Sequence, residues 1–221
     1  MSAQAGLGDD RSNPQNEAQR TFEEIERRRG AVGDGFAVLV AGYPGAGKTT
    51  FAEQAAQQLR DSTDAEVVNV ELDAAEDEVA ADVDDPRRDP KVFTAAVAEE
   101  YGLRSSDVAV IDGVASMEEI SSIAPFFDWL AIVYVKAHHA ARHHRLIEAE
   151  EASDEPDLES VSRDALRQLD DEARDSGLHA IEAADFFDIT VENELTDLGE
   201  FRAYSRYVTR TLYQEYETEM Q

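Results

Sequence analysis

Short apolar runs alternate with longer segments of helical periodicity through most of the chain. Such runs are typical of buried strands, and the segments between them have the apolar spacing of amphipathic helices. We therefore predict strands at residues 36–40, 67–71, 108–111, 130–135 and 187–191. Helices are predicted at about 48–60, 92–102, 117–124, 137–151, 159–182 and 197–217, with a capping box from Ser116 to Glu119. The alternation predicts an α/β fold in which crossover helices join parallel strands.

The first thirty residues differ from the rest. Residues 1–13 are small and polar and are expected to form a disordered tail. Asn13 can then cap a helix that has Pro14 in its first turn and ends at Gly30. The apolar stripe of this helix is thin, which fits either loose docking on the domain or binding to a partner protein. Residues 31–221 are expected to form one domain with its own core.

Charge narrows the possible partners. The chain has 49 acidic residues against 20 Lys and Arg, a formal net charge of −29, and its lysines are Lys48, Lys91 and Lys136. This excess of carboxylates repels phosphate backbones and anionic lipids, which argues against nucleic-acid and membrane partners. An acidic, lysine-poor composition is typical of halophilic proteins, whose charges are screened in molar salt.

The cysteine content and the lack of long apolar segments indicate where in the cell the protein is expected. There is no cysteine, and therefore no disulfide framework or thiolate metal site. The N-terminal residues lack an apolar run, and no stretch approaches the roughly 20 apolar residues that span a bilayer. A cytoplasmic protein is expected.

The sequence GYPGAGKTT follows the first predicted strand and opens the first predicted crossover helix, as a P-loop does. Its three glycines let the backbone wrap an anion, so that successive N–H groups point at a phosphate. Lys48 can reach the β- and γ-phosphates, and the Thr49 hydroxyl can ligate Mg²⁺. The predicted nucleotide-binding residues are Gly42, Tyr43, Pro44, Gly45, Ala46, Gly47, Lys48, Thr49 and Thr50.

Two carboxylates follow predicted strands at the edge where open α/β sheets bind ligands. Asp112 ends the third strand, where it can hold a Mg²⁺-bound water beside Thr49. The alternative is an aspartate that caps the next turn. Asp73 follows the second strand and can accept a proton from a substrate hydroxyl. It is equally compatible with a solvated acid in an acidic segment.

Arg142 and Arg145 lie three residues apart, on one face of the predicted helix after the fourth strand. There they can contact triphosphate oxygens or stack on a base, and the alternative is pairing with Glu148 or Glu151. Asn193, after the last strand, can contact a nucleotide base or can be an ordinary turn residue.

Histidines and aromatic residues give weaker signals. The spacing of four between His139 and His143 can bind a metal, but no third ligand is evident, and an exposed helix face explains the pair with His138 and His144. The aromatic residues beside strands are expected in the core rather than as stacking platforms: Phe126, Phe127, Trp129, Phe186 and Phe187.

Taken together, GYPGAGKTT, VIDGVAS, ARHHRL, SDEPD and DDEARDSGLHAIEAADFFDITVENE resemble motifs of archaeal P-loop kinase-like proteins related to dephospho-CoA kinase and adenylate kinase. The resemblance covers roughly residues 36–217. It implies a nucleotide-kinase-like three-layer fold with a five-stranded parallel sheet, a substrate-side insertion at about 73–91 and a lid at about 148–159. It also implies ATP and Mg²⁺ at Gly42–Thr49, Asp112 beside the metal, Arg142 as the first arginine of its helix and Asn193 near the adenine.

The chain departs from that family pattern at expected cations. Ala115 replaces an arginine after the third strand, and Ala149 and Glu151 lie where lid arginines are expected. One such arginine is worth about 10³ to 10⁵ in rate in related P-loop enzymes. The insertion offers Arg87, Arg88 and Lys91, and the helix after the lid offers Arg163, Arg167 and Arg174 as replacements.

The sequence therefore favours an ATP-dependent phosphotransferase that acts on a small molecule, such as a nucleotide or a dephospho-CoA-like acceptor. Its expected catalytic residues are Lys48, Asp73, Arg142 and Arg145. The alternative is a catalytically weak ATP-binding module that switches a protein partner, with residues 14–30 as a possible docking element. A guanine-specific switch is disfavoured because the chain lacks an N-K-x-D segment.

Overall fold

Five parallel strands form the centre of the structure, a computed structural model that describes residues 14–79, 89–153, 157–183, 187–194 and 197–220. The sheet order is β2-β3-β1-β4-β5. The strands are β1 (Phe36–Ala41), β2 (Val67–Glu71), β3 (Val108–Val114), β4 (Trp129–Lys136) and β5 (Ile189–Glu192). All four strand pairs are parallel. The central strand β1 thus has β3 on one side and β4 on the other, as in an open α/β sheet with a crevice at its carboxyl edge.

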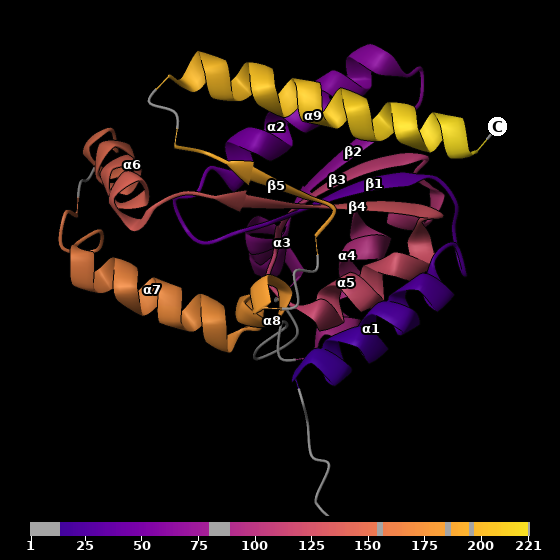
Figure 1. Cartoon of the computed structure of the whole chain (residues 1–221), viewed down its shortest axis with the longest axis horizontal. Helices are drawn as coiled ribbons and strands as arrows, with labels where there is room; N and C mark the ends of the chain where they lie inside the picture. The colour runs from indigo at the N-terminus through magenta and orange to yellow at the C-terminus, as the bar shows by residue number, and fades with distance from the viewer. Residues whose placement is uncertain (1–13, 80–88, 154–156, 184–186, 195–196, 221) are drawn as a thin grey trace, which may run out of the picture.

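Helices cover both faces of this sheet (Figure 1). One face carries α2 (Lys48–Ser62) and the long α9 (Leu198–Glu219), which pack against each other. The opposite face carries α1 (Pro14–Arg28), α3 (Leu72–Val79), α4 (Pro90–Glu100), α5 (Met117–Ile123) and α8 (Leu178–Ala183), with short 3₁₀ turns at Leu103–Ser105 and Ala124–Phe126. At the carboxyl edge lie α6 (His139–Glu151) and α7 (Arg163–Asp175).

The alternation of side chains along β1 divides the core into two halves. Phe36, Val38 and Val40 pack with α2 and α9, while Leu39 and its alanine neighbours face the other layer. Every residue of β1 is buried, because successive strand side chains point to opposite faces and both faces are covered. The predicted α/β three-layer fold with a five-stranded parallel sheet is confirmed.

One predicted helix is wrong in its extent. Residues 159–182 do not form a single helix, because the chain breaks between α7 and α8. Gly177, at the break, has a left-handed φ of 117°. A Cβ at Gly177 would lie 3.0 Å from the Ser116 Cβ, so the chain passes close to the start of α5 there.

The turn into α5 is as predicted. The Ser116 hydroxyl accepts a hydrogen bond from the Glu119 backbone N–H at 3.1 Å, and the Glu119 carboxylate accepts one from the Ser116 N–H at 3.2 Å. This reciprocal capping box fixes the chain just after the carboxyl end of β3.

The segment after β2 begins as a helix. Asp73 lies in the first turn of α3, so the insertion predicted at about 73–91 begins as a helix directly at the edge of the sheet. Residues 80–88, which include Arg87 and Arg88, lie outside the described residues, as do the predicted tail at 1–13 and Phe186.

The helix α1 is docked on the domain. Ile25 is completely buried against the α4 and α5 layer. The Arg28 guanidinium donates to the Ser121 carbonyl at 2.9 Å and to the Ser121 hydroxyl at 3.0 Å. The Gly30 N–H then donates to the Phe127 carbonyl at 2.8 Å. Of the two interpretations of this helix, docking therefore describes its C-terminal half.

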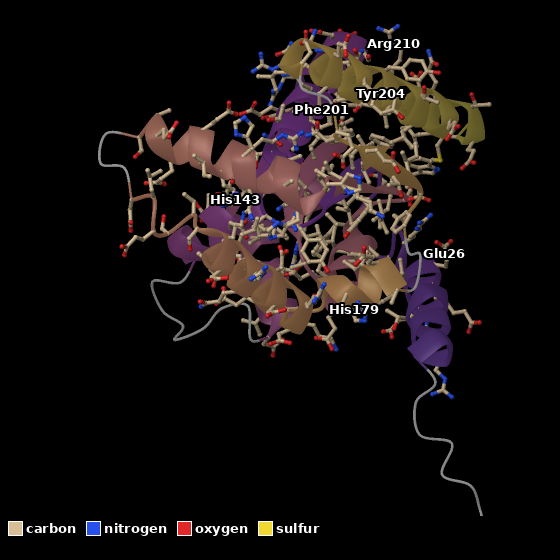
Figure 2. The ribbon with its side chains drawn as sticks, turned by 60° about the vertical axis from the view of Figure 1, so that its left-hand side comes forward. Glu26, His143, His179, Phe201, Tyr204 and Arg210 are labelled. Atoms are coloured by element: carbon tan, nitrogen blue, oxygen red, sulfur yellow. The ribbon has the colours of Figure 1, made fainter. Side chains whose placement is uncertain are left out.

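The described aromatic residues beside the strands pack as core, as predicted. Phe126 and Phe127 are buried, Phe187 stacks on Tyr134, and Trp129 stacks on Phe36 at 5.1 Å between ring centroids. On α9, Phe201 is buried while Tyr204 and Arg210 are exposed (Figure 2). Within the ranges described, no helix is long and apolar enough to cross a bilayer.

Docking of α1 predicts a stability effect. We expect Ile25→Ala to lower the free energy of unfolding by about 2–5 kcal/mol, because it leaves a cavity under a fully buried side chain. Chemical denaturation in molar KCl measures this, with the exposed neighbour Arg27→Ala as the matched control. Equal midpoints for the two variants would contradict the docking of α1.

Candidate functional site

The loop between β1 and α2 is wound so tightly that it requires glycine at two points. Gly42 has φ 148°, and a Cβ there would lie 2.3 Å from the Val135 carbonyl oxygen. Gly47 has φ 100°, and a Cβ there would lie 2.4 Å from the Asn193 amide nitrogen. Any side chain would therefore push the loop away from β4 and β5. The two glycines therefore allow the chain to run in a tight loop from the buried end of β1 into the first turn of α2.

No side chain caps the start of α2. Gly47 is the N-cap residue and offers no capping oxygen, so the first N–H groups of α2 are not satisfied from that position. Thr49 and Thr50 follow in the first turn, and Thr49 is exposed. A loop backbone and a helix N-terminus aimed at one place form a concave site for an anion.

Asn193, just after β5, holds the loop by a hydrogen bond to its backbone. Its side-chain amide donates to the Ala46 carbonyl at 2.8 Å, and its own carbonyl accepts from Arg145 at 2.6 Å. Asn193 is 4% exposed and Arg145 is partly buried. Both predicted site residues therefore hold the loop in shape, and contact of either one with a nucleotide stays a prediction.

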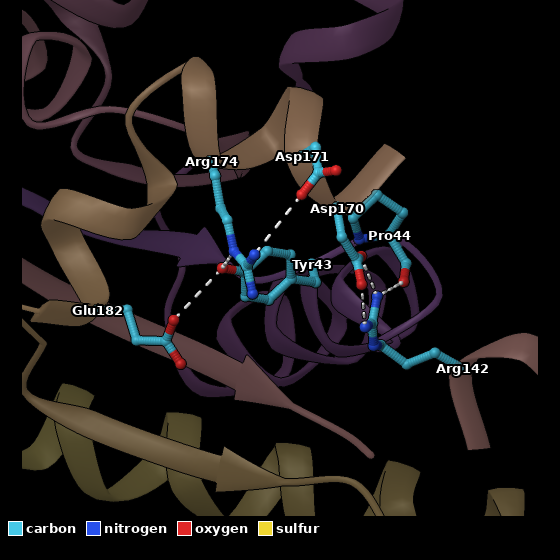
Figure 3. Close-up of polar contacts among 7 residues, drawn as sticks. All are labelled: Tyr43, Pro44, Arg142, Asp170, Asp171, Arg174 and Glu182. Atoms are coloured by element: carbon cyan, nitrogen blue, oxygen red, sulfur yellow. Dashed lines mark hydrogen bonds and ion pairs between the residues drawn. The ribbon is translucent and has the colours of Figure 1, made fainter. Parts of the chain in front are cut away.

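Arg142 joins three elements (Figure 3). Its guanidinium makes two hydrogen bonds to the Asp170 carboxylate, at 2.6 and 2.7 Å, and a third to the Pro44 carbonyl at 3.0 Å. It also lies 5.3 Å from the centroid of the Tyr43 ring. Arg142 is 5% exposed, so this pair links α6, α7 and the loop inside the protein. The predicted alternative partners, Glu148 and Glu151, are not the ones Arg142 pairs with.

A hydroxyl and a carboxylate meet beneath the loop, as the sequence predicts for a metal site. Thr49 Oγ1 donates to Asp112 Oδ2 at 2.8 Å. Asp112 is 3% exposed, and its other oxygen, Oδ1, is buried without a hydrogen-bond partner among the described residues. An orphaned carboxylate oxygen beside a hydroxyl is a suitable oxygen donor set for Mg²⁺ or its bound water.

A bulge in β3 directs Asp112 toward the loop. Val40 pairs with Asp112, but Ala41 pairs with Val114, so Gly113 is the extra residue. Gly113 has φ 86°, the left-handed conformation that a glycine bulge uses. Burial raises the pKa of the Asp112 carboxyl to about 6, although the hydrogen bond from Thr49 and the charge of Lys48 oppose that rise.

A cavity of about 300 Å³ opens beside Lys48. Its lining comes from the loop, the start of α3, the end of β3, α7 and α8: Gly42, Pro44, Lys48, Asp73, Gly113, Val114, Ala115, Leu169, Glu172, Ala173, Ser176 and Leu178. Burial lowers the pKa of the Lys48 ammonium, and the carboxylates of Asp112 and Asp73 oppose that shift. The structure thus brings Lys48 and Asp73 to one cavity, as the sequence predicts.

The helix after the lid does not direct its arginines into this cavity. Arg163, Arg167 and Arg174 are exposed. Arg167 pairs with Asp164 at 2.9 Å. Arg174 contacts the Tyr43 hydroxyl at 3.4 Å and Asp171 at 3.5 Å, and that hydroxyl donates to Glu182 at 3.3 Å (Figure 3). Arg174 is the member of this set that reaches a loop residue.

Sequence patterns did not identify Asp170, Glu172 or Glu182 as parts of the site. Each lies among several acids of a strongly acidic chain, so neither residue type nor spacing distinguishes it. Their positions follow from the path of α7 and α8 across the carboxyl edge of the sheet.

The histidines in and just before α6 are not arranged as a set of metal ligands with a third described residue. The rings of His139 and His143 stack with centroids 6.4 Å apart. His138 and His144 are exposed, and His144 lies 3.3 Å from Glu148. The part of the chain that the structure describes holds no group of three or more His, Cys, Asp or Glu arranged for a metal ion.

Comparison with known proteins adds little to this geometry. No protein-family model and no curated protein matches the chain. A solved structure titled "Crystal structure of APE1195" matches over 80% of this chain and 96% of its own, with 15% sequence identity and a TM-score of 0.46. A likeness this distant carries no argument about activity, so the site has to be interpreted from its own residues.

Proposed function

We propose that this protein binds ATP with Mg²⁺ at the loop Gly42–Thr49 and transfers the γ-phosphoryl group to a small molecule held beside Lys48. The observation that supports this most directly is the pairing of Thr49 with Asp112 beneath a glycine loop, with one Asp112 oxygen left unpartnered. A hydroxyl, a buried carboxylate and a lysine around an anion cradle form the set of groups that phosphoryl transfer needs.

In this proposal the loop and Lys48 bind the phosphates. Backbone N–H groups of Gly45, Gly47, Lys48 and Thr49 would face the β-phosphate, the Ala46 N–H being used by the Tyr43 carbonyl at 3.1 Å, and the Lys48 ammonium would bridge the β- and γ-phosphates. Arg145 and Asn193 contribute by fixing the loop backbone through the Ala46 carbonyl. A preformed loop loses little conformational entropy on binding.

Thr49 and Asp112 would hold the metal. The Thr49 oxygen has lone pairs free for a cation while its hydroxyl proton is donated to Asp112 Oδ2, and Oδ1 can accept from a metal-bound water. When bound, Mg²⁺ neutralises charge on the β- and γ-phosphates as the terminal bond breaks.

Asp73 would act as the base. Its carboxylate lies at the cavity, 3.6 Å from the position that a Cβ on Gly113 would take. As the acceptor oxygen bonds to the γ-phosphorus, Asp73 takes the hydroxyl proton, and the bond to the β-phosphate oxygen breaks to leave ADP. This requires an acceptor that carries a hydroxyl group.

A second function is favoured by one observation. The arginines of α7 do not line the cavity, so the transferring phosphoryl group has no cation from the lid side among the described residues. This fits a catalytically weak ATP-binding module whose α6–α7 region changes position with nucleotide and thereby regulates a protein partner. Dependence of turnover on an acceptor separates the two functions.

We also propose that the protein works in a cytoplasm of molar salt, where counterions screen its charge of −29.

Removal of the Lys48 ammonium should abolish turnover. We expect Lys48→Ala to lower acceptor-dependent ADP formation by about 10³-fold or more, because the γ-phosphoryl loses its nearest cation. The assay follows ADP from Mg²⁺-ATP in molar KCl with a panel of hydroxyl acceptors. Lys136→Ala, which removes an exposed lysine outside the cavity lining, is the matched control.

The same assay decides between the two functions. A rate that rises with an acceptor and disappears in Lys48→Ala supports phosphoryl transfer. Lys48-dependent ATP binding without any acceptor-dependent rate would favour the binding module. If ATP binds wild type and Lys48→Ala equally well, both functions are wrong.

Titration of Asp112 predicts a pH dependence of metal-nucleotide binding. Its pKa of about 6 means that the carboxyl is protonated below that pH and ionised above it. The ionised form binds Mg²⁺, so affinity for Mg²⁺-ATP should rise as the pH increases from 5 to about 7 and then level off.

Calorimetric titration across this range, with Asp112→Asn as the control, isolates the effect. Both proteins share the titration of the nucleotide itself, so the difference between their pH profiles belongs to Asp112. Parallel profiles would show that Asp112 does not contact the metal.

A further inference from the structure

We propose that the acceptor is a small neutral or positively charged alcohol, such as a polyol or an amino alcohol, and not a phosphate monoester. This inference rests on the proposed phosphoryl transfer and concerns the same cavity. It differs from the nucleotide or dephospho-CoA acceptor that the family resemblance implies, and it comes from the charges around Lys48.

The cavity wall is acidic. Among the described residues that line it, Lys48 is the single basic side chain, whereas Asp73 and Glu172 are both acids. Glu172 faces the cavity from α7 and Asp73 from α3, so carboxylates lie on two separate elements of the wall. The remaining lining side chains are uncharged.

In the proposed complex Lys48 neutralises the γ-phosphate and is not available to neutralise a phosphate group on the acceptor. The carboxylates of Asp112, Asp73 and Glu71 already act on its ammonium, and in the proposed complex it contacts the γ-phosphate. A phosphate group on the acceptor would therefore face carboxylates and the γ-phosphate with no further cation on the described wall. Like charges repel, so a second anion in this cavity is disfavoured, and because Asp73 and Glu172 are solvent-exposed the effect depends on ionic strength.

Two described guanidinium groups that contact the loop, those of Arg142 and Arg174, pair with other residues. Arg142 is buried in its paired contacts with Asp170 and the Pro44 carbonyl. Arg174 is exposed and contacts the Tyr43 hydroxyl and Asp171 (Figure 3). Neither residue lines the cavity, so neither offers a site for an acceptor phosphate.

The volume of the cavity also favours a small acceptor. A cavity of about 300 Å³ lies at the lower end of the range for ligand sites, roughly 300–1,000 Å³, and part of it must admit the γ-phosphate. The walls from Leu169, Ala173 and Leu178 can contact the carbon atoms of a short chain. Such an acceptor would place one hydroxyl beside Asp73 and an ammonium or a second hydroxyl beside Glu172.

Acceptors of similar size that differ from glycerol by one charged substituent test the inference. Glycerol, 2-amino-1,3-propanediol and glycerate share a three-carbon chain with a primary hydroxyl and carry no charge, a positive charge and a negative charge. Adenosine and AMP form a second pair. The assay uses the full chain with Mg²⁺-ATP, follows ADP formation, and is run at the lowest KCl concentration at which the protein stays folded and again in molar KCl, where screening should reduce the difference between acceptors. We expect kcat/KM to be lower for the anionic member of each set, on the order of tenfold or more.

A charge reversal on α7 tests the role of the wall. Glu172→Lys should raise the ratio of kcat/KM for glycerate to that for 2-amino-1,3-propanediol by on the order of tenfold. Asp175→Lys makes the same kind of change on an exposed residue of α7 outside the cavity lining, and should leave that ratio within about twofold. Because both residues are exposed, both variants should fold.

Failure of the inference differs from failure of the proposed function. A preference for glycerate or AMP in the wild type, with the ratio unmoved in Glu172→Lys, would overturn the inference and leave phosphoryl transfer in place. ATP binding without ADP formation for any of the five compounds would overturn both. A lower rate for the anions together with the shift in Glu172→Lys supports the inference.

Discussion

The close passage of one loop past its neighbours determines the rest of the site. Between β1 and α2 the backbone runs so near the Val135 carbonyl and the Asn193 amide that only glycine fits at positions 42 and 47. Both contacts come from the ends of other strands, β4 and β5, and Asp112 approaches from the third neighbour, β3. The sheet order therefore brings the glycine loop, a carboxylate and a supporting amide to one point at the carboxyl edge.

Much of this was predictable because it depends on local sequence. The apolar runs identified the five strands within a few residues, and the loop motif between a strand and a helix identified the cradle. The capping box at Ser116 was predictable for the same reason, since Ser and Glu three residues apart satisfy each other's backbone.

The remaining features depend on contacts between distant segments. The end of α7 is set by the close approach of Gly177 to Ser116, which no local periodicity reveals. Arg142 was predicted to contact phosphate or a glutamate on its own helix, but its partner Asp170 lies 28 positions away in an acid-rich stretch. The composition of the cavity wall is likewise a property of the assembled fold, because α3, β3 and α7 each contribute part of it.

Several polar residues near the loop stabilise structure at the site. Asn193, Arg145 and Arg142 each contact a backbone carbonyl of the loop or of its neighbour β5. A loop rich in glycine loses more conformational entropy on folding than other segments, so outside contacts are needed to keep it in one shape. Their effect on nucleotide binding can therefore come through the geometry of the loop.

The buried pair between Arg142 and Asp170 also constrains motion. It joins α7 to the loop, so α7 cannot move away while the guanidinium stays in its present place without leaving a charge unpaired inside the protein. Such a separation costs about 3–5 kcal/mol, which corresponds to an open form populated in roughly one molecule in 150 to one in 5,000. The pair therefore restrains α7 against the loop, and the rate at which α7 can move is limited by how often the Arg142–Asp170 contacts break.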